Sequence, residues 1–135
     1  MNLTLAELNA VGASFLPGLL GIEVDSVEEG CVSAHLDVRE HHLAPNGYLH
    51  AAAVIALADT ACGYGCILNL PEDGTGFTTI ELKTNFLRTV QEATITCKAR
   101  MVHGGRTTQL WDATVASQDG RPMALFRCTQ LVLRS

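Results

Sequence analysis

The chain has 135 residues, of which 47% are hydrophobic and 17% are charged. This length fits one domain, and the hydrophobic content excludes an intrinsically disordered chain. The net charge of −5 argues against a general nucleic-acid-binding protein. We therefore expect one globular domain over residues 1–135, without a nucleic-acid partner.

Neither a membrane span nor a signal peptide is expected. The most apolar stretch, Ala51 to Ala58, ends after eight residues at Asp59, whereas a membrane helix needs about 20. The chain begins without a basic n-region, so we expect a cytoplasmic protein. The five cysteines lack the C-x-x-C spacing of a zinc site and are interpreted as reduced thiols that serve as small apolar residues.

The charges are unevenly distributed along the chain. Residues 1–82 carry eleven acidic side chains and one basic one, whereas residues 83–135 carry eight basic and three acidic ones. A locally basic half on an acidic protein suits a small polyanionic ligand better than a duplex. Uneven solvated surface explains the same pattern, so both interpretations stay open.

The first third of the chain predicts a short helix followed by a hairpin. Apolar spacing indicates a helix over residues 3–11 with Thr4 as its N-cap. Its continuation is broken by four residues: Gly12, Pro17, Gly18 and Gly21. Period-two alternation predicts a half-buried strand over 31–39, with 21–27 as its hairpin partner. Residues 40–49 are predicted to be a loop.

The remainder predicts one long helix and four strands. Residues 50–68 are apolar nearly all round and rich in Ala and Gly, which is typical of a buried helix that lies close to a sheet. Strands are expected at 77–87, 93–103, 107–117 and 122–133, with a type I′ turn at Asp119-Gly120. An antiparallel sheet with helices on one face is an α+β fold, and the sheet most simply wraps around the central helix.

Asp59 stands out in the predicted helix. No formally charged residue occurs in the nine positions before it or in the twelve after it. Burial removes solvation from a carboxylate and raises its pKa, so an unpaired acid in a packed helix favours a functional role. Two other interpretations stay open: Asp59 caps a break in the helix, or this stretch of helix is exposed.

The start of the helix is a second candidate site. Gly47-Tyr48-Leu49-His50 leads into three alanines, so no side chain is expected to shield the first backbone N–H groups. Such groups bind anions or oxyanions at a helix N-terminus. His50 is expected to have a structural role, such as capping the helix, with ligand binding as the alternative. Asp59 lies about 13 Å further along the helix axis, so a substrate chain has room to lie along it.

Other catalytic signatures are missing from the sequence. Without a G-x-S-x-G elbow, a serine hydrolase of the α/β type is disfavoured. Without G-x-x-x-x-G-K-[ST] or G-x-G-x-x-G, nucleotide hydrolysis and nicotinamide binding lack support. His41, His42 and His50 do not have the spacing of metal ligands, so no metal site is expected. Cys62 and Cys66 share a helix face, which we attribute to packing.

The segment from His41 to Gly65 reads H-H-L-A-P-N-G-Y-L-H-A-A-A-V-I-A-L-A-D-T-A-C-G-Y-G and resembles the hot-dog-fold thioesterases of the phenylacetic-acid-degradation (PaaI) type. In that family a loop N-x-x-G-x-x-H-G-G opens the central helix, and an acid follows the His by nine residues, as Asp59 follows His50. F-T-T-I-E-L-K-T-N-F after the helix and a late G-R-T-T segment extend the resemblance over nearly the whole chain.

The resemblance implies a sheet wrapped around a long helix, and a homodimer or a dimer of dimers. It also implies hydrolysis of acyl-coenzyme A thioesters at the dimer interface, with no cofactor other than the coenzyme A of the substrate. In that scheme Asp59 is the general base or nucleophile, and the N–H of Ala51 or Ala52 polarises the thioester carbonyl. The hydroxyl of Thr79 helps to orient water from the partner subunit.

The resemblance also assigns residues to substrate binding. The candidates for substrate binding are Gly47, His50, Gly63, Lys83, Arg88 and Arg106. Of these, the basic side chains of Lys83, Arg88 and Arg106 are expected to meet the phosphates of coenzyme A. Two departures from the family motif concern the helix entry. Ala44 stands where the motif has an amide, for which Asn46 is a candidate substitute. Ala51 and Ala52 replace two glycines, which keeps the N–H donors but adds two methyl groups.

Two other functions stay open at this point. Some hot-dog proteins are hydratases or dehydratases, which use an acid and a His in a different arrangement. A module that binds acyl-coenzyme A without cleaving it is also compatible with the two departures. The sequence does not distinguish an aryl from an aliphatic acyl group.

Overall fold

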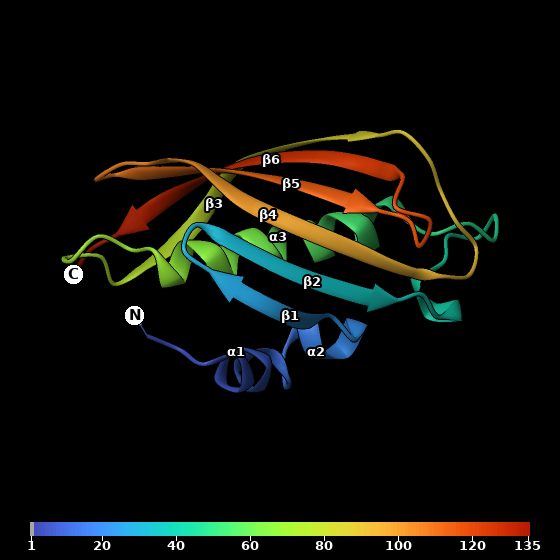
Figure 1. Ribbon diagram of the computed structural model, residues 1–135, viewed down its shortest axis with the longest axis horizontal. Helices are drawn as coiled ribbons and strands as arrows, with labels where there is room; N and C mark the ends of the chain where they lie inside the picture. Colours follow the sequence, from blue (N-terminus) through green and yellow to red (C-terminus); the bar gives the residue numbers. More distant parts are fainter. Residues whose placement is uncertain (1) are drawn as a thin grey trace.

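The structure, a computed structural model, describes residues 2–135. A six-stranded antiparallel sheet packs on one long helix, and two short helices lie beside the first strand (Figure 1). In chain order the elements are α1 (Leu5–Gly12), α2 (Leu16–Leu20), β1 (Glu23–Glu28), β2 (Cys31–Asp37), a 3-10 turn (Glu40–His42), α3 (Ala51–Leu68), β3 (Gly76–Phe86), β4 (Thr94–Gly104), β5 (Thr108–Ala116) and β6 (Pro122–Leu133). The α+β prediction is confirmed.

The sheet order is β1-β2-β4-β5-β6-β3, so β1 and β3 are its two edges. β3 follows α3 in the sequence but pairs with the last strand, β6, at the far edge. The strand pairs β2–β4, β4–β5 and β5–β6 fill the space between the edges, and α3 packs across all of them. This order places the strand that follows the helix beside the end of the chain.

The N-terminal segment forms two helices rather than the single one predicted. Thr4 caps α1 through a capping box: its hydroxyl accepts the Glu7 N–H, and the Glu7 carboxylate accepts the Thr4 N–H. The expected break in the first helix is confirmed, because α1 ends at Gly12, but Pro17 and Gly18 lie inside the second helix, α2, which was not predicted. Proline is tolerated in the first turn of a helix, where its missing N–H is not needed. Gly21, with φ of 81°, then ends α2.

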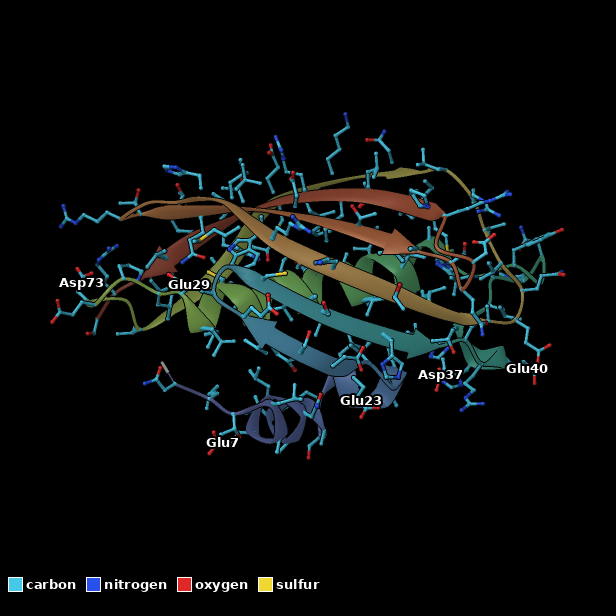
Figure 2. The ribbon with its side chains drawn as sticks, viewed as in Figure 1. Glu7, Glu23, Glu29, Asp37, Glu40 and Asp73 are labelled. Atoms are coloured by element: carbon cyan, nitrogen blue, oxygen red, sulfur yellow. The ribbon has the colours of Figure 1, made fainter. Side chains whose placement is uncertain are left out.

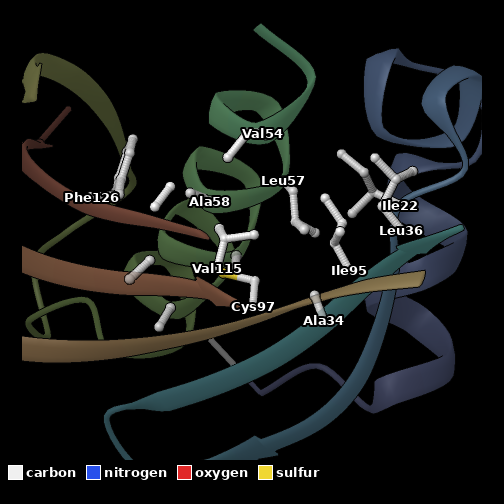
Figure 3. Packing of buried hydrophobic residues seen from close by; sticks show 14 of the residues in the cluster. Ile22, Ala34, Leu36, Val54, Leu57, Ala58, Ile95, Cys97, Val115 and Phe126 are labelled. Atoms are coloured by element: carbon white, nitrogen blue, oxygen red, sulfur yellow. The ribbon is translucent and has the colours of Figure 1, made fainter. Parts of the chain in front are cut away.

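α3 forms the centre of the core through its small residues. Four of its residues are fully buried: Leu57, Ala58, Ala61 and Cys62. Side chains from the helix and from the strands meet in the space between α3 and the sheet (Figure 3). The inward faces of β4 and β6 complete this core, with the following residues buried: Ile95, Cys97, Ala99, Ala124, Phe126 and Cys128. The start of α3 is less covered, since Ala51 and Ala52 are exposed.

The membrane expectation rested on the longest uninterrupted apolar stretch. By length and composition alone, α3 as a whole is long and apolar enough to cross a membrane. Half of these residues are buried against the rest of the protein, which is the position of a core helix.

The β5–β6 turn differs from the predicted type I′ turn. Type I′ requires positive φ at both central residues, but of Asp119 and Gly120 only Gly120 has it, at 84°. The Ser117 N–H donates to the Arg121 carbonyl at 2.9 Å, and the Gly120 N–H donates to the Ser117 carbonyl at 2.9 Å. The connection is therefore longer than a two-residue hairpin, with glycine as its one left-handed residue.

β3 contains an irregularity that changes which side chains point inward. Its register with β6 shifts between Thr79 and Glu81, which leaves Ile80 without a partner, as in a β-bulge. Before the bulge the side chain of Thr79 lies on the inner face, opposite the buried Gln130. After the bulge the inner face is taken by Leu82, opposite the buried Cys128. The bulge thus lets odd and even residues of one strand face α3.

Gly65 of α3 lies directly against the ring of Trp111 on β5. A Cβ added there would lie between 2.4 and 2.9 Å from three atoms of the fully buried Trp111 ring. We expect Gly65→Ala to lower the free energy of unfolding, because overpacking costs about 1–3 kcal/mol while the better helix propensity of Ala returns at most about 1 kcal/mol. Urea denaturation measures the difference. Gly76→Ala, where no atom lies within 4 Å of the added Cβ, is the control. Unchanged stability of Gly65→Ala would show that the ring has room to move.

Candidate active site

The Asp59 carboxylate lies between α3 and the edge strand β3. The residue is half-buried, and the Thr79 hydroxyl lies 3.2 Å from its Oδ1. Burial raises the pKa of the Asp59 carboxyl above its ordinary value, and this rise exceeds the lowering that a proton donated by the Thr79 hydroxyl would bring. The carboxyl is therefore a stronger base than an exposed aspartate, which suits a group that takes up a proton.

Asp59 differs from the other acids of residues 2–135. Twelve of them are exposed, and three of these, Glu7, Glu40 and Asp73, lie at the outer edges of the molecule in Figure 2. The other half-buried one, Asp112, forms a bidentate pair with Arg127, with the Nη2–Oδ2 distance at 2.8 Å. Within this described part of the chain, Asp59 is the one half-buried carboxylate with no ion pair.

The interpretation that Asp59 caps a helix break is excluded, because α3 continues unbroken to Leu68.

The start of α3 is capped, which corrects the expectation that no side chain shields its N–H groups. The Ala52 N–H donates to His50 Nδ1 at 2.9 Å, so His50 is the N-cap. The Ala53 N–H donates to the His50 carbonyl at 3.0 Å. Among the hydrogen bonds of residues 2–135, the Ala51 N–H has no acceptor. Of the two predicted donors, the amide of Ala51 is thus the one available to a ligand.

A pocket of about 390 Å³ opens in front of this helix end. It is lined by Ala44, Asn46, Tyr48, Leu49, His50, Ala51 and Thr89. Gly47, with φ of 87°, makes the turn that carries the loop around the pocket, and its N–H donates to the Ala44 carbonyl. Asn46 is exposed and accepts the Tyr48 N–H through Oδ1. The structure therefore brings Asn46, His50 and Ala51 together, as candidates from one loop.

Other predicted residues lie apart from this pocket. Thr79 is beside Asp59 on the same chain. Gly63 is buried, and its Cα faces the Phe77 ring so closely that an added Cβ would lie 2.8 Å from it. Since Asp59 is eight residues beyond Ala51, about 12 Å of helix separates the carboxylate from the free amide. Within one chain, the carboxylate and the free amide therefore lie at two separate places.

The three basic candidates are not brought together within the chain. Lys83 lies on the outer face of β3, opposite Arg127 and away from α3. The Arg88 N–H donates to Met123 O near the start of β6, whereas Arg106 accepts a hydrogen bond from Arg134 beyond its end. A strand as long as β6 spans about 35 Å, so Arg88 and Arg106 lie at opposite ends of the sheet.

One buried polar residue near Asp59 was missed in the sequence. Gln130 has no exposed surface, and its Oε1 accepts the Thr79 hydroxyl at 2.7 Å. The alternation of Ala124, Phe126, Cys128 and Val132 marks the inner face of β6, and Gln130 occupies the position that the apolar pattern skips. A polar residue at an inward position of a buried strand was the signal that could have found it.

Comparison with known proteins places the chain in a family. A family model described as the thioesterase superfamily matches residues 46–124. The proofreading thioesterase EntH of Klebsiella pneumoniae is 32% identical over 132 residues, covering 98% of this chain and 96% of that protein. A 1,4-dihydroxy-2-naphthoyl-CoA hydrolase of Listeria monocytogenes is 32% identical over 110 residues, covering 82% of this chain and 89% of that protein.

Solved structures agree with these sequence relatives. A thioesterase from Pseudomonas aeruginosa, crystallised as a glutamine-to-alanine variant, superimposes with a TM-score of 0.94 at 29% identity and covers 100% of this chain and 97% of its own. The E. coli PaaI protein gives 0.78 at 28% identity, with 87% and 83% covered. A thioesterase-type protein from Streptococcus pneumoniae, solved with coenzyme A, gives 0.76 at 26% identity, with 84% and 87% covered. The expected resemblance is confirmed: the chain has the hot-dog fold and belongs to the thioesterase superfamily.

Proposed function

We propose that the protein hydrolyses acyl-coenzyme A thioesters, with Asp59 as general base or nucleophile. The observation that carries this proposal is the half-buried carboxylate of Asp59, which has a hydroxyl partner and no ion pair among residues 2–135. Two relatives support the substrate class: one is named as a hydrolase of a CoA thioester, and one structure holds coenzyme A.

The proposed chemistry needs a proton acceptor and an oxyanion site. Asp59 either takes a proton from water as the water oxygen attacks the thioester carbon, or attacks that carbon itself to form an anhydride that water then opens. The C–S bond breaks, and the coenzyme leaves as its thiol after taking up a proton. The N–H of Ala51 donates to the oxygen on which negative charge develops.

Both groups can act on one thioester only if two chains contribute. A reacting carbonyl must lie about 3 Å from both the nucleophile and the oxyanion donor. Ala51 and Asp59 of one chain are separated by about 12 Å along the helix, which is too far. We therefore propose a homodimer in which the helix start of one copy approaches the Asp59 of the other. The phosphates of coenzyme A are proposed to meet Lys83, Arg88 or Arg106.

The surface near Asp59 supports a second copy at this place. β3 is an edge strand of 11 residues, so its outer row of N–H and C=O groups is available for pairing. Two of its inner-face side chains, Leu82 and Phe86, are 39% and 45% exposed. Apolar side chains on the inner face of a sheet are normally covered, and a second copy at this edge supplies the cover.

Replacing the proposed base should abolish most of the activity. We expect Asp59→Asn to lower kcat by about 10²–10⁴-fold, because the amide cannot accept the proton or attack the carbon. Release of free thiol from a panel of aryl- and alkyl-acyl-CoAs measures the loss. Circular dichroism and size-exclusion chromatography confirm that the variant is folded. Normal turnover by folded Asp59→Asn would remove Asp59 from the mechanism, and tight binding without thiol release by the wild type would favour a binding module.

The same substitution should stabilise the protein at neutral pH. The folded-state pKa of Asp59 is raised above its ordinary value of 3.8, so the native state holds this proton more tightly than the unfolded state. Stability is therefore lost as pH rises above 3.8 and the carboxyl ionises, a loss that the Asp59→Asn variant does not suffer because its amide stays neutral. Urea denaturation should show Asp59→Asn to be more stable than the wild type at neutral pH, with the gap closing in acid. A gap that does not change with pH would contradict a desolvated carboxyl.

The oxyanion donor can be removed without removing the helix. Ala51 is the first helical residue, where proline is favoured, and His50 has φ of −68° and ψ of 135°, which a following proline accepts. We expect Ala51→Pro to lower kcat by about 10²–10³-fold while the melting temperature is maintained. Ala51→Ser, which keeps the N–H, is the control. Full activity of Ala51→Pro would exclude this amide.

Coexpression of the two inactive variants tests whether the site is shared. A hybrid of Ala51→Pro and Asp59→Asn chains has one site with both groups intact if the copies exchange them. Random pairing should then restore about one quarter of wild-type activity. If each chain carried a complete site, the mixture would be as inactive as its parts.

A further inference from the structure

Gln130 is the buried polar side chain next to the proposed base. It lies on the inner face of β6 with no exposed surface, directly across the ladder from Thr79 on β3. Leaving an amide inside an apolar strand face costs free energy unless its polar atoms are hydrogen-bonded. The contacts of Gln130 therefore show what the residue does there.

The two ends of the Gln130 amide have different partners. Its Nε2 lies 3.5 Å from Cys128 Sγ, and its Oε1 lies 2.7 Å from Thr79 Oγ1. A threonine hydroxyl has a single proton to donate. Gln130 Oε1 at 2.7 Å is a closer acceptor than Asp59 Oδ1 at 3.2 Å. The proton therefore points to Gln130, and the lone pairs of the hydroxyl face the carboxyl.

We propose that Gln130 is a positioning residue for Asp59: it draws the Thr79 proton away, so that the hydroxyl accepts a proton from the carboxyl instead of donating one. A carboxylate facing lone pairs gains less from ionising than one that receives a hydrogen bond. Gln130 thus keeps Asp59 basic through Thr79, without touching it. The inference rests on the proposed function only in assuming that the basic Asp59 carboxyl takes part in catalysis.

The neighbouring buried glutamine has a different pattern. Gln109 is the cross-strand partner of Gln130 on β5, and its exposed fraction is 1%. Its Oε1 accepts the Trp111 indole N–H at 2.7 Å, and its Nε2 donates to the Asn69 carbonyl at 2.8 Å. These contacts hold a core ring and the end of α3. Gln109 is therefore a matched control, buried in the same way but without contact to Thr79.

Other ionisable groups around Asp59 do not account for its basicity. Cys62 on α3 is buried, and Cys128 on β6 and burial raise its pKa, so its thiol stays neutral at physiological pH. Glu81, the next acid on β3, is exposed and lies on the other side of the bulge. No cation of residues 2–135 forms an ion pair with Asp59. The Thr79 hydroxyl is the polar contact through which the carboxyl is tuned.

The test titrates the Asp59 carboxyl directly, without substrate. Protein labelled with ¹³C at the aspartate carboxyl carbon is titrated by NMR, and Asp59→Asn identifies the signal. We expect Gln130→Met to lower the titration midpoint, because the freed Thr79 proton turns to the carboxylate. Gln130→Glu retains an acceptor and adds a nearby negative charge, so it should raise the midpoint. The acidic limb of kcat/KM should move in the same two directions.

Two comparisons separate positioning from structural support. In a Thr79→Val background, Gln130→Met should leave the midpoint unchanged, since the hydroxyl that links the two residues is gone. Gln109→Met should lower thermal stability without moving the midpoint. If Gln130→Met does not fold, Gln130→Leu replaces it, because the charge that Gln130→Glu adds raises the midpoint even without the Thr79 hydroxyl. An unmoved midpoint in the folded Gln130 variants, or an equal shift without the Thr79 hydroxyl, would overturn the inference. If the midpoints shift but Asp59→Asn retains turnover, the positioning role of Gln130 is supported, whereas the proposal that Asp59 is the catalytic base is rejected.

Discussion

Removing water from a carboxylate costs free energy, and the elements around Asp59 determine how much of that cost is recovered. α3 is rich in alanine and glycine, which lets it lie close against the sheet and withdraw the acid from solvent. β3 brings one hydroxyl, and no cation of residues 2–135 pairs with the carboxyl. A salt bridge here would stabilise the anion and weaken it as a base. Without such a partner, the rise in the pKa of Asp59 that burial causes is not offset by a neighbouring charge.

Local sequence patterns predicted most of the fold, because each pattern extended over many residues. The period-two runs gave four strands whose observed ends differ by one residue or less, and the long apolar run gave α3. The errors occurred where residue type and position conflict. Pro17 and Gly18 favour a break, yet proline suits a first helical turn. Asp119-Gly120 favours a two-residue turn, yet the hydrogen bonds of Ser117 define a longer one.

Only part of the candidate site could be predicted, because some of its features lie within one short segment of the sequence and others join distant segments. Asp59 and the helix entry could be singled out from their neighbours in the chain. The expectation that His50 caps the helix is confirmed, whereas which N–H it caps depends on a side-chain rotamer, which sequence spacing does not give. The Asp59, Thr79 and Gln130 contacts join α3, β3 and β6, and they depend on the pairing of β3 with the last strand. The family resemblance supplied Thr79 as a candidate, whereas neither pattern nor resemblance supplied Gln130.

The bulge at Ile80 divides β3 into two stretches of opposite phase. Upstream of it, the strand sets the hydroxyl of Thr79 under the helix; downstream, it directs Leu82 and Phe86 to the same side. Deleting a single residue at the bulge would restore a regular ladder but rotate one of the two stretches outward. Evolution can therefore exchange the apolar half of this edge for another substrate or partner while the polar half keeps its orientation, provided that the extra residue is retained.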